Sequence, residues 1–166
     1  MKFLSDKLDL RLYQQTILGT ASKHNTLVVI PTGMGKTFIA IGLAGLLANT
    51  GKKVLMLAPT KPLCVQHWKT FSRFFDSKDD ELVVMTGAVA PEVRKKLWAS
   101  GRIFFATPQT VENDLMRRFI VPDEYGLVVF DEAHRAVGDY AYVWIAKQFN
   151  TVNNTRLLAM TASPAS

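Results

Sequence analysis

Short apolar runs recur along the chain, and each is followed by a segment with polar residues. The runs span residues 27–30, 54–57, 82–85, 103–106, 127–130 and 157–160. Because they are continuously apolar rather than alternating, they are typical of strands covered on both faces. Segments long enough for helices lie between them, at residues 37–49, 62–75, 91–100 and 108–119. The alternation predicts an α/β fold with a mostly parallel, doubly wound sheet flanked by helices.

The size and composition fit one domain spanning residues 1–166. The chain has 48% hydrophobic and 20% charged residues, which suits a chain that buries a core and excludes disorder as its main state. Its formal net charge is +6. This surplus permits a polyanionic partner without requiring one.

Several classes of protein are excluded by what the chain contains. Cys64 is the single cysteine, and it shows no zinc-ligand spacing with His24, His67 or His134. The N-terminus lacks the features of a secretion signal. The longest apolar run, residues 38–48, is too short for a membrane span of about 20 residues. We therefore expect an intracellular, cytoplasmic protein with no membrane partner.

The residues that follow the apolar runs are small, polar or acidic. They are residues 31–33, 58–60, 86–87, 107–109, 131–134 and 161–163. Ligands of open α/β sheets bind at the carboxyl ends of the strands. The pattern therefore predicts that one edge of the sheet is a polar site.

A glycine-rich loop, Pro31-Thr32-Gly33-Met34-Gly35-Lys36-Thr37, stands between a predicted strand and a predicted helix. Its backbone N–H groups, with those of the helix N-terminus, suit the binding of phosphate. Lys36 would reach the β- and γ-phosphates of ATP, and the Thr37 hydroxyl would bind Mg²⁺. Ile30 occupies the position at which the usual pattern has glycine. The alternative is a glycine-rich turn with an exposed lysine.

A second acidic site follows the apolar run at residues 127–130. Asp131 can hold Mg²⁺ largely through water, and Glu132 can act as the general base that polarises the attacking water. The alternative is an acidic helix N-terminus stabilised by the helix dipole. The glycine-rich loop upstream favours the metal site.

Asp131-Glu132-Ala133-His134 and the glycine-rich loop resemble the DEAH box and P-loop of superfamily 2 helicases. This resemblance implies a RecA-like P-loop NTPase lobe that uses ATP and Mg²⁺. Arg11 and Gln14 resemble the family's adenine-reading motif. The resemblance to superfamily 2 also implies that His134, with Thr161 and Ser163 of an S/T-A-T/S motif, couples hydrolysis to strand movement.

Three further segments resemble nucleic-acid motifs of the same superfamily. They comprise Pro59, Thr60 and Lys61, then Thr86 and Gly87, and finally Thr107, Pro108 and Gln109. Hydroxyls and backbone N–H groups at helix starts can hold phosphates without reading bases. The alternative is plain helix capping, because Thr before Pro is a common helix start. Both roles can hold at once.

Other conspicuous side chains are left outside the site. The charge clusters at residues 52–53, 94–96 and 117–118 are interpreted as solvated surface, and the tryptophans as packing residues. Cys64 and His67 follow the first nucleic-acid motif on a predicted helix. Core packing is expected for Cys64 and a solvated helix face for His67.

Residues 130–142, with the motifs at 58–63 and 107–114, closely resemble the archaeal Hef and eukaryotic FANCM branch. This resemblance implies an ATP-dependent translocase acting on forked or branched DNA in the repair of stalled forks. A chain with few inserts favours an archaeal source. The rivals are an RNA-directed translocase of the RIG-I type and a nucleotide-gated DNA-binding scaffold. The family also needs a second RecA-like lobe with an arginine finger, which we do not find in this sequence, so these residues alone should hydrolyse ATP very slowly.

Overall fold

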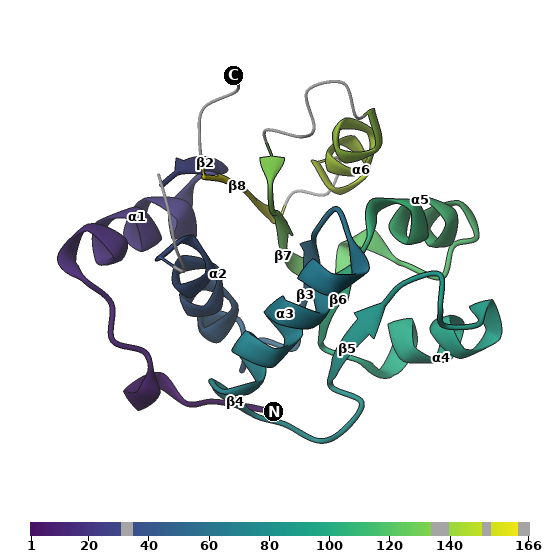
Figure 1. Cartoon of the computed structure of the whole chain (residues 1–166), viewed down its shortest axis with the longest axis horizontal. Helices are drawn as coiled ribbons and strands as arrows, with labels where there is room; N and C mark the ends of the chain where they lie inside the picture. Colours follow the sequence, from purple (N-terminus) through teal and green to yellow (C-terminus); the bar gives the residue numbers. More distant parts are fainter. Residues whose placement is uncertain (31–34, 134–139, 151–153, 163–166) are drawn as a thin grey trace.

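A six-stranded parallel sheet forms the centre of the molecule in the computed structural model (Figure 1), which describes residues 1–30, 35–133, 140–150 and 154–162. Its strands are β2 (Thr26–Val29), β3 (Lys53–Leu57), β5 (Leu82–Met85), β6 (Ile103–Ala106), β7 (Tyr125–Phe130) and β8 (Arg156–Thr161). The strand order is β2-β8-β7-β3-β6-β5, and every neighbouring pair is parallel. The predicted α/β fold is therefore confirmed, with each strand within two residues of its predicted ends.

Helices connect these strands. They are α1 (Leu12–Lys23), α2 (Gly35–Leu46), α3 (Lys61–Ser72), α4 (Pro91–Ser100), α5 (Pro108–Met116) and α6 (Tyr140–Asn150), with the 3₁₀ turns η1 (Ser5–Lys7) and η2 (Pro122–Glu124). The four predicted helices are α2 to α5. Three of them end earlier than predicted; α5 stops two residues before Arg118, whose φ of 61° lies in the left-handed region and breaks the helical geometry.

The helices cover both faces of the sheet. Side chains of α1, α2 and α3 pack on one face, and those of α4, α5 and α6 pack on the other. A hydrophobic core lies on each face of the sheet, and alternate residues of β3 belong to different cores. Val54 and Met56 face α1, α2 and α3, and Leu55 and Leu57 face α4, α5 and α6. A strand buried on both sides must be apolar throughout, which explains the unbroken runs in the sequence.

A small second sheet lies outside the predicted pattern. β1 (Lys2–Phe3) pairs antiparallel with β4 (Phe75–Asp76), directly after α3. The Phe3 ring lies so close to Gly45 of α2 that a Cβ at this glycine would come within 2.4 Å of it. Glycine at position 45 is therefore required for the N-terminal strand to pack here. None of the described helices is long and apolar enough to cross a membrane.

Two of the predicted surface charges are buried, so their interpretation as solvated is wrong. Arg94 of α4 donates two hydrogen bonds to Asp114 of α5, from Nε at 2.7 Å and from Nη2 at 3.0 Å. Lys53 of β3 donates to Glu124 Oε2 and to the Trp98 carbonyl, both at 2.7 Å. Partner groups brought from elsewhere in the chain make these burials possible. Trp98 is in the core, as predicted.

The strand order divides the functional edge of the sheet into two halves. The carboxyl ends of β2, β8 and β7 carry the predicted nucleotide residues and are called the nucleotide half. Those of β3, β6 and β5 carry the predicted nucleic-acid motifs and are called the nucleic-acid half. The halves meet where β7 pairs with β3. A side chain at this boundary can touch both halves.

Candidate nucleotide and nucleic-acid site

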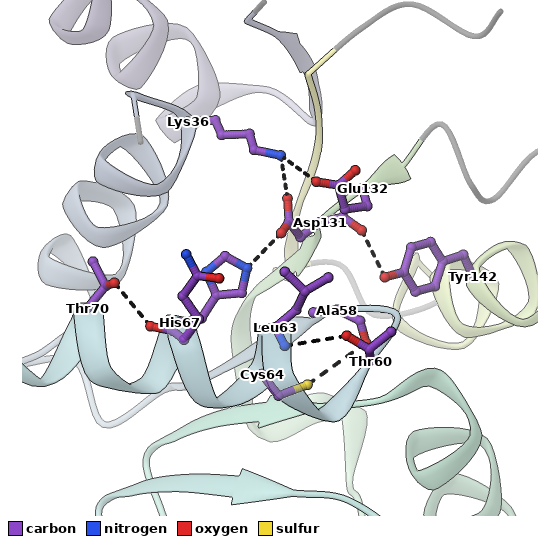
Figure 2. Close-up of polar contacts among 11 residues, drawn as sticks. Lys36, Ala58, Thr60, Leu63, Cys64, His67, Thr70, Asp131, Glu132 and Tyr142 are labelled. Atoms are coloured by element: carbon purple, nitrogen blue, oxygen red, sulfur yellow. Dashed lines mark hydrogen bonds and ion pairs between the residues drawn. The ribbon is translucent and has the colours of Figure 1, made fainter. Parts of the chain in front are cut away.

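Lys36 meets both predicted catalytic carboxylates at the boundary of the nucleotide half (Figure 2). It stands in the first turn of α2, and Asp131 and Glu132 follow β7. Lys36 Nζ lies 3.0 Å from Asp131 Oδ1 and 3.1 Å from Glu132 Oε1. The structure therefore brings together the lysine and the acidic pair. Of the predicted phosphate-binding loop, Thr32, Gly33 and Met34 lie outside the described residues, and Gly35 begins α2.

Burial and charge pairing act in opposite directions on these groups. Burial alone lowers the pKa of Lys36, but its hydrogen bonds and charge contacts with Asp131 and Glu132 outweigh burial and raise the pKa. Burial likewise raises the pKa of Asp131, which is 1% exposed. Hydrogen bonds and charges of His67 and Lys36 outweigh this effect, so the pKa of Asp131 is lowered. Both groups are charged at neutral pH.

The backbone at the acidic pair is held from two sides. The Asp131 N–H donates to the Leu57 carbonyl of β3 at 2.9 Å. The Tyr142 hydroxyl of α6 donates to the Asp131 carbonyl, also at 2.9 Å and buried. The next residue, Glu132, has a φ of 56°, which is costly for a residue with a Cβ. Such strain persists only where surrounding contacts impose it.

His67 contacts the predicted metal carboxylate, Asp131, and the sequence interpretation missed this. It was expected on a solvated face of α3, but it is only 6% exposed. Its Nε2 lies 2.6 Å from Asp131 Oδ2. The residue lies on the sheet-facing side of α3, with Cys64 one turn before it, and Figure 2 shows its ring directed at Asp131. In the sequence, the signal that could have predicted its burial is its spacing: His67 follows Cys64, which was expected in the core, by three residues on the predicted helix and so shares its face.

The donor set at this edge fits Mg²⁺ bound together with a triphosphate. Thr37 is buried in α2 beside Lys36 and offers a hydroxyl, and Asp131 offers a carboxylate. Among the described residues, no three His, Cys, Asp or Glu side chains gather into a metal site. Mg²⁺ is commonly held by one or two carboxylates together with substrate phosphates and water. One hydroxyl from Thr37 and one carboxylate from Asp131 match this donor set.

The predicted adenine-reading residues lie at the start of α1. Gln14 is buried, and its amide joins two backbones: Oε1 accepts from the Arg11 N–H at 2.8 Å, and Nε2 donates to the Gly35 carbonyl at 3.3 Å. A primary amide has two N–H groups and two acceptor lone pairs. These contacts leave capacity for an adenine edge while anchoring α1 to the first residue of α2. The Arg11 side chain is exposed.

Thr161 ends β8 beside Ile30, which precedes the predicted phosphate loop in the sequence. Its carbonyl accepts a hydrogen bond from the Ile30 N–H at 3.1 Å, and its side chain is buried. The two other residues predicted for coupling, His134 and Ser163, lie outside the described residues.

The predicted nucleic-acid residues lie at the ends of β3, β5 and β6. Thr60 is the N-cap of α3 and accepts from the Leu63 N–H, so its capping role is confirmed. Thr60, Lys61, Gly87 and Gln109 are exposed, Pro59 and Thr107 are half-buried, and Thr86 and Pro108 are buried. The exposed members can meet a ligand directly. Those that are buried shape the loops.

Cys64 packs in the core, as predicted. It is fully buried, its Sγ lies 3.9 Å from the Ala58 carbonyl, and burial raises the pKa of its thiol to about 12. A buried and protonated thiol is a weak nucleophile. Cys64 therefore belongs to the packing of α3 on the sheet.

Known proteins resemble almost the whole chain. The family model described as "Type III restriction enzyme, res subunit" matches residues 7–166. A Methanocaldococcus jannaschii protein, MJ1505, which carries the provisional name of an ATP-dependent RNA helicase, is 44% identical over 96% of this chain. The Saccharomyces cerevisiae ATP-dependent DNA helicase MPH1 is 42% identical over 95% of it. The chain spans 20% of the first relative and 16% of the second.

A solved structure agrees with the fold. The crystal structure of the Pyrococcus furiosus Hef helicase domain superposes with a TM-score of 0.92 and 46% identity, covering 100% of this chain and 36% of that one. The RecA-like fold is thus shown by sequence and by structure together. The chain belongs to the family of type III restriction enzyme res subunits and forms, within superfamily 2, an N-terminal lobe of the Hef and FANCM type.

Proposed function

We propose that this lobe is the ATP-binding half of an ATP-dependent DNA helicase or translocase that acts on forked or branched DNA during the repair of stalled forks. The observation that carries the proposal is the contact of Lys36 with both Asp131 and Glu132 at the end of β7. The name of the MPH1 relative supports DNA as the substrate. The protein would act inside the cell, together with a second RecA-like lobe.

The residues of the nucleotide half have separate tasks. Lys36 binds the β- and γ-phosphates, while Thr37 and Asp131 hold Mg²⁺, Asp131 largely through water. The bound ion supplies charge that stabilises the transferring phosphoryl group. Glu132 lies next to Asp131 and accepts a proton from the attacking water. Gln14 and Arg11 contact the adenine end of the nucleotide, and His134, Thr161 and Ser163 couple the two halves of the edge.

The nucleic-acid half holds the DNA strand by its backbone. Thr60, Thr86 and Thr107 stand at the ends of three strands that share one edge, so they form a row. The exposed members, Thr60, Lys61, Gly87 and Gln109, present a hydroxyl, backbone N–H groups and one lysine charge, while Pro59, Thr86, Thr107 and Pro108 shape the loops around them. Such contacts fix the position of a strand without reading its sequence.

A substitution of Lys36 tests the nucleotide site. Lys36→Ala should abolish binding of a fluorescent ATP analogue, because it removes the charge that meets the phosphates, while circular dichroism shows the fold retained. Lys69→Ala is the control, since Lys69 is an exposed lysine on α3. If Lys36→Ala binds the nucleotide as tightly as the unchanged protein, the assignment of the P-loop is wrong.

A comparison of nucleic acids tests the substrate. We expect forked DNA to bind more tightly than duplex RNA of equal length, and Lys61→Ala to weaken binding with a smaller salt dependence. The rival is an RNA-directed translocase, which the name of the MJ1505 relative favours. Tighter binding of duplex RNA would replace the DNA assignment with this rival.

A nucleotide-gated scaffold that binds branched DNA without unwinding it is the remaining alternative. Asp131 and Glu132 are both present and both contact Lys36, and a protein that only binds nucleotide has no need of a general base. Strand separation of a labelled fork by the full-length protein, with ATP, distinguishes a helicase from a scaffold.

A further inference from the structure

We propose that His67 is a positioning residue for Asp131: by hydrogen bonding to one carboxylate oxygen, it fixes the other oxygen in the orientation that serves Mg²⁺–nucleotide binding. The proposal rests on the proposed function of the nucleotide half. It gives a task to a residue that stands outside the motifs named above.

The two oxygens of Asp131 have different partners. Oδ2 lies 2.6 Å from His67 Nε2, whereas Oδ1 lies 3.0 Å from Lys36 Nζ. A carboxylate can only accept hydrogen bonds, so His67 Nε2 is the donor in this contact. Lys36 and His67 reach the carboxylate from different helices, α2 and α3. His67 thus leaves Oδ1 available to the nucleotide half.

The carboxylate needs such a partner because its own torsion is soft. The terminal torsion of an aspartate side chain is broad, so packing alone does not set the plane in which the two carboxylate oxygens lie. A short hydrogen bond to a charged acceptor is stronger than a neutral one. In metal sites, partners behind the first ligands orient them, and their loss typically costs about 10- to 100-fold in metal affinity or activity.

His67 is itself held rigidly. It is 6% exposed, and its neighbours on the same face of α3, Cys64 and Phe71, are fully buried. The helix begins at the Thr60 cap in the nucleic-acid half, about two turns before His67. The Asp131 carboxylate of one half is therefore fastened to a helix of the other half, at the boundary between β7 and β3.

The experiment measures how Mg²⁺ supports nucleotide binding rather than turnover. A fluorescent ATP analogue is titrated into the protein with EDTA, and Mg²⁺ is then titrated at a fixed nucleotide concentration. In His67→Leu we expect the Mg²⁺ midpoint to rise at least about 10-fold, while affinity without Mg²⁺ is unchanged. His67→Gln, whose amide N–H can replace the ring N–H, should restore the midpoint to within about three-fold.

Thr70→Val is the matched control. Thr70 is buried on the same helix and donates to the Gln66 carbonyl at 3.0 Å. If His67→Leu leaves the Mg²⁺ midpoint unchanged, or if Thr70→Val shifts it equally, the proposal is overturned. Failure of His67→Gln to restore binding also overturns it.

A second variant covers the case in which His67→Leu does not fold. His67→Asn keeps an amide but shortens the side chain, so the amide should fail to reach Asp131 Oδ2. We expect it to raise the Mg²⁺ midpoint as His67→Leu would. An unchanged midpoint in folded His67→Asn overturns the proposal. The nucleotide site is judged separately, from the unchanged protein and Lys36→Ala. If nucleotide binding does not depend on Lys36, the proposed function fails, and the role of His67 fails with it.

Discussion

Glu132 combines a proposed catalytic role with an unfavourable backbone conformation. Its φ is 56°. The residue before it, Asp131, is fixed by two hydrogen bonds: its carbonyl accepts from the Tyr142 hydroxyl, and its N–H donates to the Leu57 carbonyl. The left-handed conformation costs a residue with a Cβ about 1–2 kcal/mol. Catalytic sites commonly retain such strain because it aims a side chain. At Glu132, it directs the carboxylate toward Lys36.

A pair of substitutions at Glu132 measures this strain. Glu132→Gly and Glu132→Ala both remove the carboxylate, but only alanine keeps the Cβ. We expect the free energy of unfolding, measured in denaturant, to be about 1 kcal/mol higher for Glu132→Gly. At exposed Lys95 in α4 the same pair should show the reverse order, because glycine is the poorer helix former by about 1 kcal/mol. Equal stabilities of the two Glu132 variants would show that no strain is stored there.

At the level of single residues, the sequence predicted which charged residues meet at the sheet edge, but not the side chains that pack around them. Lys36, Asp131 and Glu132 follow apolar runs in recognisable motifs, and the structure brings them into contact. His67 carries no such pattern. Its contact with Asp131 depends on β7 lying next to β3, which the local sequence does not contain. Arg94 was misjudged for the same reason, because its partner Asp114 is 20 residues away.

Helices α4 and α5 are joined by a buried polar cluster. Asp114 is fully buried and accepts from Arg94 Nε and from Trp98 Nε1, each at 2.7 Å. The same arginine donates from Nη1 to the Val89 carbonyl, in the loop that follows Thr86 and Gly87. The cluster therefore connects the loop after Thr86 and Gly87 to α5, the helix that begins at Pro108.

Asp114→Asn should expose the dependence of these helices on the cluster. An amide can no longer accept from all three donors, and Arg94 would keep a buried charge without a counter-charge. We expect the free energy of unfolding to fall by about 3 kcal/mol. Asp79→Asn, at an exposed aspartate, should change it by less than about 0.5 kcal/mol. A loss of under about 1 kcal/mol in Asp114→Asn would mean that α4 and α5 are held by apolar packing alone.

At the level of elements, the positions of the six main strands could be predicted from the sequence, but the order in which they pair could not. Strands β5 and β6 have their predicted ends, because continuous apolar runs mark strands buried on both faces. Strands β1 and β4 were not predicted, because each has only two residues and so forms no recognisable apolar run. The order of strands in the sheet also could not be read from the sequence, because it depends on crossovers between distant segments.

For the molecule as a whole, the proposed function requires a second lobe. On this lobe, Lys36 pairs with Asp131 and Glu132, the two carboxylates proposed to hold the metal and to act as general base. In this superfamily, an arginine finger from a second lobe would complete the site, and such a finger contributes about 10³–10⁵ in rate.

The 166 residues alone should therefore turn over ATP at least about 10³-fold more slowly than the full-length protein, with or without forked DNA. Phosphate release measured on both proteins checks this. Glu132→Gln in the full-length protein is the control, because it removes the base without removing a lobe. Robust DNA-stimulated turnover by the 166 residues would show that one lobe is sufficient.

The position of β2 has a consequence for how the protein is made. This strand leads into the nucleotide loop, yet in the described sheet it pairs only with β8, so Val28 aligns with Met160. Contacts between such distant segments form late, because a long loop must close first. During synthesis, β2 leaves the ribosome early and must wait for β8 before it can join the sheet. The nucleotide site should thus be among the last parts of the nascent chain to assemble, which would delay ATP binding until this lobe is nearly complete.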